Sequence, residues 1–269
     1  KWNWNSPLLI SPHDHRRIYY GAERLFRSDD RGESWVAVSG DLSRQIDRNR
    51  LEVMGRIWSV DAIAKNNSTS MYGSIIALDE SSLVEGLLYA GTDDGLIHVT
   101  SDGGANWTRY DTFRGVPEMS LVEDIIASRH DADVAYAVFD NHKRGDHKPY
   151  VLRTRDRGAN WTLVNAGLPE RGAAHTLVED HVDPDLLFLG TEFALYVSVD
   201  RGVSWHRLMN GLPTVPVHDM VIHPRDNDLI AGTHGRGIWI MDDISPLQQA
   251  TSKVLTADAH LFEAVKPGT

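Results

Sequence analysis

The chain has 269 residues, which is enough for one large all-β domain or two ordinary domains with a substantial core. Its formal net charge of -11 at pH 7 argues against a nucleic acid as partner. It has no cysteine, which excludes disulfides and thiolate metal sites, and no apolar run is long enough for membrane insertion.

One eight-residue pattern, Ser/Thr-x-Asp-x-Gly-x-x-Trp, occurs four times, and we call each copy an Asp turn. The copies are SDDRGESW (28–35), TSDGGANW (100–107), TRDRGANW (154–161) and SVDRGVSW (198–205). We expect the Asp or Ser side chain to accept hydrogen bonds from backbone N–H groups one to three residues on, the Gly to supply a positive φ, and the Trp to cover the turn. The residues with these structural roles are Ser28, Asp30, Gly32, Trp35, Thr100, Asp102, Gly104, Trp107, Thr154, Asp156, Gly158, Trp161, Ser198, Asp200, Gly202 and Trp205.

Short apolar runs separated by Gly, Asp and Pro precede each Asp turn and predict strands joined by hairpins. They define five units that start near Ser6, Gly73, Ser120, Ala173 and Val215. Each unit has strands A, B, C and D, with the Asp turn between C and D. In the fifth unit MDDISP replaces the Asp turn, so this unit is degenerate or terminal.

A four-stranded unit that repeats every 40 to 50 residues or so predicts an all-β fold, a β-propeller with about five blades that forms part of a larger ring. A β-sandwich gives no reason for repeating one turn so regularly. Residues 1–246 form the propeller units in this interpretation, and residues 247–269 form a linker or tail toward a missing domain. The start without Met is what we expect of part of a longer or processed protein.

Two segments depart from the repeat. The stretch 41–73 between the first two units is long enough for a short helix after an Asp or Ser cap. The hairpin 139–150 in the third unit is enlarged and rich in Asp, His and Lys. Its Asp140, His142, Asp146 and His147 offer mixed N and O ligands, but a solvated hairpin is favoured, so the sequence predicts no metal site and no cofactor.

The Asp turn resembles the Asp-box, or bacterial neuraminidase repeat, of sialidases, xyloglucanase-type glycoside hydrolases and sortilin-type receptors. Residues 2–250 are most similar to sortilin-like bacterial propeller proteins, often labelled glycosyl hydrolases. The resemblance implies an exported, periplasmic or extracellular propeller whose Asp-box turns lie opposite the ligand-binding mouth. It implies no particular activity. Residues 113–117 (FRGVP) match the sialidase Arg-Ile-Pro signature only loosely, because the Ile is missing, and the chain has no cysteine for the cysteine-rich module of sortilin-type receptors.

If the Asp turns share one rim, the B to C hairpins and the starts of the A strands share the other. We predict that His175, His218, His234 and Arg236 bind a ligand there. Asp93, Asp94 and Glu192 are candidate carboxylates for glycoside hydrolysis, which needs two carboxyl groups about 5 to 10 Å apart. The alternative for Asp93 and Asp94 is a simple Asp-Asp-Gly hairpin turn.

The sequence thus favours a binding or scaffold module that takes a glycan or peptide. The remaining blades of the same protein, or another copy, are its expected protein partners. A sialidase-like or xyloglucanase-like glycoside hydrolase stays open as the alternative.

Overall fold

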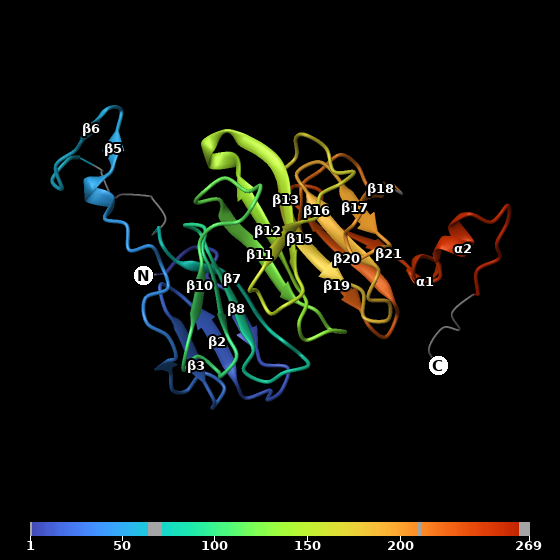
Figure 1. Ribbon diagram of the computed structural model, residues 1–269, viewed down its shortest axis with the longest axis horizontal. Coiled ribbons are helices and arrows are strands. Elements are labelled where there is room, and N and C mark those ends of the chain that lie inside the picture. Colours follow the sequence, from blue (N-terminus) through green and yellow to red (C-terminus); the bar gives the residue numbers. More distant parts are fainter. Residues whose placement is uncertain (1, 64–71, 209–210, 264–269) are drawn as a thin grey trace.

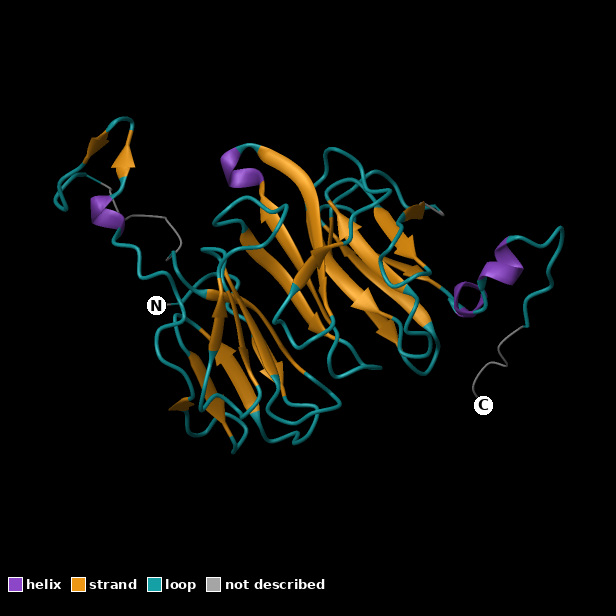
Figure 2. Cartoon of the chain, viewed as in Figure 1, coloured by secondary structure: helices purple, strands orange, loops and turns teal. Residues whose placement is uncertain are grey.

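The computed structural model describes residues 2–63, 72–208 and 211–263. Five main antiparallel sheets follow one another in chain order along an arc, from the N-terminal end to the C-terminal tail (Figures 1 and 2). In every sheet, strands that are consecutive in the chain are hydrogen-bonded neighbours. This confirms the predicted all-β propeller fold, with each sheet as one blade.

The first four sheets have four strands each. The first sheet contains β1 (Leu8–Ile10), β2 (Ile18–Gly21), β3 (Leu25–Ser28) and β4 (Val36–Ala37), and the second contains β7 (Ile75–Glu80), β8 (Leu88–Thr92), β9 (Ile97–Thr100) and β10 (Thr108–Tyr110). The third sheet contains β11 (Leu121–Ala127), β12 (Ala135–Asn141), β13 (Asp146–Thr154) and β14 (Trp161–Leu163). The fourth contains β15 (Ala174–Glu179), β16 (Leu187–Thr191), β17 (Leu195–Ser198) and β18 (His206–Leu208). The fifth sheet contains β19 (Val217–His223), β20 (Asp228–Thr233) and β21 (Ile238–Met241).

The hydrophobic core lies between adjacent sheets. Tyr89 and Phe139 belong to the cluster between the second and third sheets, and Tyr136 and Trp205 to the cluster between the third and fourth. Similar clusters join the first sheet to the second and the fourth to the fifth. Because both faces of an inner sheet are covered, its B strand reads as an unbroken apolar run, as in β8 and β16, which are buried throughout.

Glycines in the B strands allow the next sheet to approach closely. A Cβ atom on Gly91 would lie 2.4 Å from Cγ1 of Val122 in the next A strand, and one on Gly190 would lie 2.6 Å from the carbonyl oxygen of Val217. The equivalent Gly232 of the fifth sheet meets only Asp219 of its own sheet, at 3.5 Å. Gly91 and Gly190 therefore lie where one blade packs closely against the following one.

Carboxylates in the A strands join neighbouring sheets near the centre of the arc. Asp79 Oδ2 accepts a hydrogen bond of 2.8 Å from the N–H of Ala127, and Asp124 Oδ2 accepts one of 2.9 Å from the N–H of Leu177. These bonds link β7 to β11 and β11 to β15. The A strands also line a hollow of about 610 Å³.

The fifth sheet differs from the prediction of four strands, since the structure gives it three. The MDDISP segment lacks the Gly and Trp of an Asp turn, so no C to D turn forms there. Instead Ile244 is buried and its N–H donates to the carbonyl oxygen of Asn227 at 2.8 Å. The chain then continues into α1 (Ser245–Gln248), which has a proline in its first turn.

The long stretch 41–73 contains a short 3₁₀ helix, η1 (Arg48–Arg50). As expected, an Asp caps it, because Asp47 accepts a hydrogen bond from the N–H of Asn49 at 2.9 Å. A small hairpin of β5 (Glu52–Val53) and β6 (Arg56–Ile57) follows and was not predicted. The C-terminal tail holds α1 and α2 (Ser252–Leu255), and its residues 264–269 lie outside the described residues.

Candidate functional site

The Asp turns are closed by their own side chains. In the first copy, Ser28 Oγ donates to Asp30 Oδ1 at 2.7 Å and accepts from the N–H of Gly32 at 2.8 Å, while Asp30 Oδ1 accepts from the N–H of Ser34 at 2.9 Å. The other copies repeat these bonds, with Asn106, Asn160 and Ser204 as the corresponding donors. As expected, the Ser or Thr hydroxyl also accepts from the N–H two residues on, at 3.3 Å in the first copy, whereas the Asp side chain reaches the N–H four residues on, one residue beyond the expected range.

The glycines of the Asp turns have the predicted positive φ, from 79° at Gly202 to 101° at Gly104. The tryptophans do more than cover their own turns. Trp35 Nε1 donates to Gly32 of its own turn, but Trp205 is buried and its Nε1 donates to the carbonyl oxygen of Val164 at 2.8 Å, at the end of the third unit. Trp107 likewise reaches Val38 at 3.1 Å. These contacts fasten one unit to the preceding one.

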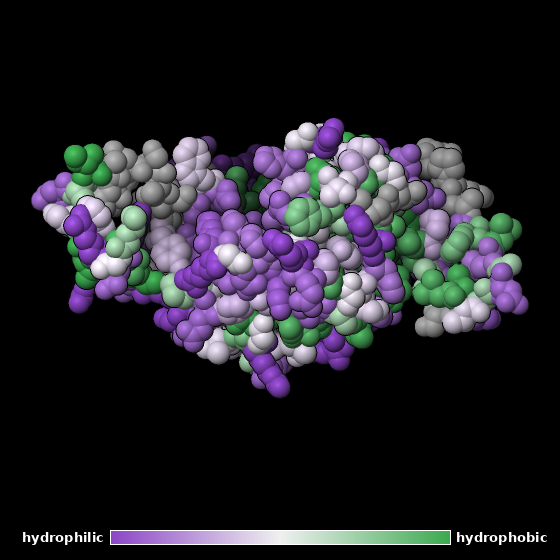
Figure 3. Space-filling model, turned by 90° about the horizontal axis from the view of Figure 1, so that it is seen from above, coloured by the Kyte–Doolittle hydropathy of each residue, from purple (hydrophilic) through white to green (hydrophobic). Residues whose placement is uncertain are grey.

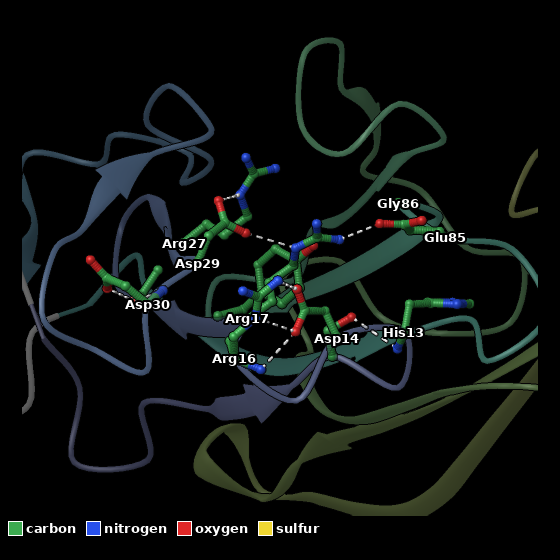
Figure 4. Close-up of polar contacts among 12 residues, drawn as sticks. His13, Asp14, Arg16, Arg17, Arg27, Asp29, Asp30, Glu85 and Gly86 are labelled. Atoms are coloured by element: carbon green, nitrogen blue, oxygen red, sulfur yellow. Dashed lines mark hydrogen bonds and ion pairs between the residues drawn. The ribbon is translucent and has the colours of Figure 1, made fainter.

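The Asp turns and the A to B turns form one rim. The N–H of Arg31 donates to the carbonyl oxygen of Arg16 at 2.9 Å, and the third and fourth sheets repeat this bond. Figure 4 shows Arg17 between Asp29 and Glu85, with N to O distances of 2.9 and 2.6 Å, so an ion pair bridges the first two sheets. The polar groups of this rim largely bond to one another.

The opposite rim carries the B to C hairpins and contains the candidate site. In Figure 1 the hairpin with the 3₁₀ helix η2 (His142–Arg144) marks this upper side, and Figure 3 views it from above, where hydrophilic residues cover much of the central surface. A hollow of about 870 Å³ opens here. It is lined by His142, His147, Arg171, Gly172, Ala173, His175, Glu192, Phe193, His218 and His234. We call this hollow the mouth.

Four of the seven residues predicted for this face come together in the mouth. The rings of His175 and His218 stack with centroids 4.2 Å apart, and His234 meets His218 edge-on at 5.7 Å. Glu192 Oε2 lies 2.9 Å from Nε2 of the buried His175. These side chains come from the fourth and fifth sheets, and the third sheet contributes His142 and His147.

β-Bulges aim the central side chains of this cluster. The A to B pairing shifts register between Ile75 and Ala77, Val122 and Asp124, Ala174 and Thr176, and Val217 and Asp219. The residues skipped by the pairing are Ile76, Glu123, His175 and His218. A bulge re-aims the side chain of the extra residue. The structure thus adds Glu123 to the cluster of His175 and His218, a residue that was not predicted from the sequence. The signal was present, because EDI (123–125) in the third unit aligns with HTL (175–177) and HDM (218–220) in the next two units.

The remaining predicted residues lie elsewhere. Asp93 Oδ1 accepts bonds of 2.8 Å from the N–H groups of Gly73 and Ser74. Asp94 is fully buried and accepts from the N–H of Arg44 at 2.7 Å. Both carboxylates therefore anchor the connection between the first two units. Arg236 is exposed in the last hairpin and does not line the mouth.

Burial governs the charge states in and beside the mouth. Burial, together with repulsion from the nearby Asp140 and Asp124, raises the pKa of Glu123 to about 7. Partial desolvation by the surrounding residues also lowers the pKa of the His218 imidazole, with His175 adding repulsion. Asp140 forms a close pair with Nδ1 of His142, while Asp146 accepts a hydrogen bond from the hydroxyl of Tyr150 at 2.7 Å. The enlarged hairpin thus uses its carboxylates locally.

Comparisons with known proteins support the fold. No family model matches the chain, and no curated protein sequence matches it. The structure is similar to a GH74 xyloglucanase from Xanthomonas campestris, with a TM-score of 0.63, 21% identity, and coverage of 88% of this chain and 36% of that one. An ancestral GH74 enzyme is similar with a TM-score of 0.61 and 15% identity, and the match covers 84% of this chain and 27% of that one. The Swd1 β-propeller domain of Myceliophteria thermophila is similar with a TM-score of 0.63 and 10% identity, and the match covers 96% of this chain and 70% of that one.

These likenesses define the chain as a β-propeller protein. The chain spans only about a third of the length of the two GH74 enzymes, at 27% and 36%. In the described part of the chain, no helix is both long and apolar enough to cross a membrane.

Proposed function

We propose that this chain is a ligand-binding propeller module and that the mouth holds a short glycan or peptide segment. The observation that carries the proposal is the convergence of His175, His218 and His234 with Glu192 around one hollow of about 870 Å³. Ligand sites are concave and combine apolar surface with a few convergent polar groups. The mouth has this character.

The side chains around the mouth offer three kinds of contact. Phe193 is 49% exposed and gives a flat apolar face for a sugar ring or an apolar side chain. Arg171 is exposed and offers a bidentate donor to a carboxylate. The imidazoles of His218 and His234 provide both donors and acceptors.

Binding is better supported than hydrolysis. A glycoside hydrolase needs a pair of carboxyl groups at the scissile bond. Asp93 and Asp94 are engaged by backbone N–H groups between the first two units, so Glu192 alone of the three predicted carboxylates lines the mouth. The similarity to GH74 enzymes concerns the fold and leaves their reaction as the alternative.

The test is a screen of the purified chain against a glycan array and a peptide library, with hits measured by calorimetry. Phe193→Ala should weaken binding of a hit about tenfold, equivalent to about 1.4 kcal/mol, without changing the melting temperature. Val203→Ala is the matched control, because Val203 is also exposed but lies in an Asp turn on the other rim. Loss of binding in the control, or full binding by Phe193→Ala, would contradict the proposal.

We also propose that the outer sheets pack against the remaining blades of the same protein or another copy. Leu8 and Ile10 of the first sheet and Ile238 and Ile240 of the fifth are exposed, although they belong to strands. Exposed apolar groups on strands favour association. Light scattering should show association of this chain as its concentration rises, and a monomer throughout would contradict the idea.

The resemblance to exported propellers supports a periplasmic or extracellular location. Fractionation of the producing cells, followed by detection with an antibody, tests this. Recovery of the protein only from the cytoplasmic fraction would overturn the assignment.

A further inference from the structure

A cluster of potential metal ligands lies where the mouth meets the hollow lined by the A strands, because His175 and His218 line both and Glu123 lines the second. A carboxylate oxygen of Glu123 and one ring nitrogen each of His175 and His218 all lie within 4.8 Å of one another. They come from β11, β15 and β19, the innermost strands of three consecutive sheets. Their common position at the A-strand bulge explains why three residues 43 or more positions apart in the chain meet at one point.

His175 provides an independent sign of a missing ligand. Its side chain is only 6% exposed, and Nε2 faces Glu192 Oε2 at 2.9 Å. Nδ1 is buried and has no hydrogen-bond partner among the described residues. If Nε2 carries the proton that it shares with Glu192, Nδ1 presents an unused lone pair. A carboxylate on the far nitrogen is the usual outer partner of a metal-binding histidine.

Glu123 has no hydrogen-bond partner among the described residues. No ion pair joins its carboxylate to another described residue either, and the repulsion from Asp140 and Asp124 is only partly offset by Lys143 and His142. A divalent cation would stabilise the ionised carboxylate of Glu123, which releases its proton when it binds the ion. The exposed His218 leaves the outer side of the cluster open to the mouth.

We propose that Glu123, His175 through Nδ1, and His218 form a binding site for a divalent transition-metal ion of the zinc class. Two imidazoles and one carboxylate suit Zn²⁺ and its neighbours better than Ca²⁺ or Mg²⁺, which prefer oxygen ligands. Ligand atoms of tetrahedral zinc lie about 3.3 Å apart for bonds of about 2.0–2.1 Å, so binding requires the cluster to contract and the stacked rings of His175 and His218 to turn until their lone pairs converge. The inference stands apart from the ligand proposed above, because it concerns the ion alone.

The experiment uses the tag-free chain after removal of metals with a chelator. Calorimetry with Zn²⁺ should give one site per chain and a raised melting temperature, and Co²⁺ should produce a visible absorption band. Mg²⁺ should give none of these signals. Phe193→Ala should leave the metal signals unchanged, so failure of the ligand proposal and failure of the metal proposal are distinguishable.

Variants locate the site. Glu123→Gln and His218→Ala should each weaken Zn²⁺ binding at least about tenfold. His218 is exposed, so its loss should leave the fold intact. His206→Ala is the control, because His206 is an exposed histidine on β18 of the same sheet as His175. Absence of Zn²⁺ binding by the unmodified chain, or equal binding by His218→Ala and His206→Ala, would overturn the proposal.

Discussion

The close packing of one blade against the next is tested most directly by replacing a B-strand glycine with alanine, which adds a single methyl group. Gly91 and Gly232 occupy equivalent B-strand positions in the second and fifth sheets, opposite Ala77 and Asp219. Neither has a positive φ, so alanine is free of backbone strain at both. They differ in what a Cβ atom would meet.

At Gly91 the new Cβ would lie 2.4 Å from Cγ1 and 2.8 Å from Cβ of Val122, which is fully buried. Such overpacking costs about 1–3 kcal/mol. Reduced freedom of the unfolded chain offsets about 0.4–1 kcal/mol of this cost. We therefore expect Gly91→Ala to lower the free energy of unfolding by about 1–2 kcal/mol and the melting temperature by about 2–8 °C.

At Gly232 the nearest atom is the carbonyl oxygen of Asp219 at 3.5 Å, which is an ordinary contact. Only the effect on the unfolded chain remains, so Gly232→Ala should stabilise the protein by about 0.4–1 kcal/mol. The two substitutions thus have opposite signs although the chemical change is the same. Urea unfolding followed by tryptophan fluorescence measures both.

A second variant shows that the contact with Val122 is the cause. In a Val122→Ala background the cost of Gly91→Ala should shrink, because Cγ1, the nearest atom, is gone. The reasoning is refuted if Gly232→Ala costs as much as Gly91→Ala, or if Val122→Ala leaves the cost of Gly91→Ala unchanged.

Further predictions concern the Asp turns and the central carboxylates. Asp200→Ala should lower the free energy of unfolding in urea by about 1–2 kcal/mol, because it removes the acceptor for the N–H of Ser204. The control Asp185→Ala loses only an exposed ion pair and should lower it by less than about 0.5 kcal/mol. Equal effects of the two variants would contradict a structural role for the turn. Burial raises the pKa of Asp79 to about 7, above its ordinary 3.8. The folded state therefore binds this proton more tightly, and stability falls as pH rises from about 4 through 7, by at most about 1.4 kcal/mol per pH unit. Asp79→Asn should flatten the dependence of the unfolding free energy on pH between about 4 and 7, and an unchanged slope would contradict a raised pKa for Asp79.

The fold was largely predictable from the sequence, because its signals are local. The spacing of Asp30, Gly32 and Trp35 recurs in three further units, and each copy closes a turn with its own side chains. Apolar runs between the turns supply strands whose order in the sheet equals their order in the chain. The absence of Gly and Trp from MDDISP also indicated the incomplete fifth unit.

The candidate site was predictable only in part. His175 and His218 hold equivalent places in successive units, so repetition alone placed them side by side. Asp93 and Asp94 have the same residue types as a catalytic pair, yet backbone N–H groups engage both. Whether a carboxylate binds a ligand or its own backbone depends on neighbours that a hairpin sequence does not specify.

The sequence by itself determined the repeating units and the rim on which each turn lies, because strand alternation and turn chemistry act over a few residues. The tertiary structure decided which side chains meet. Glu123 comes close to His175 only because each A strand has a bulge at the same position, which re-aims the side chain of the extra residue. Register between strands depends on packing against the adjacent sheets, and that packing exists only once the blades have assembled.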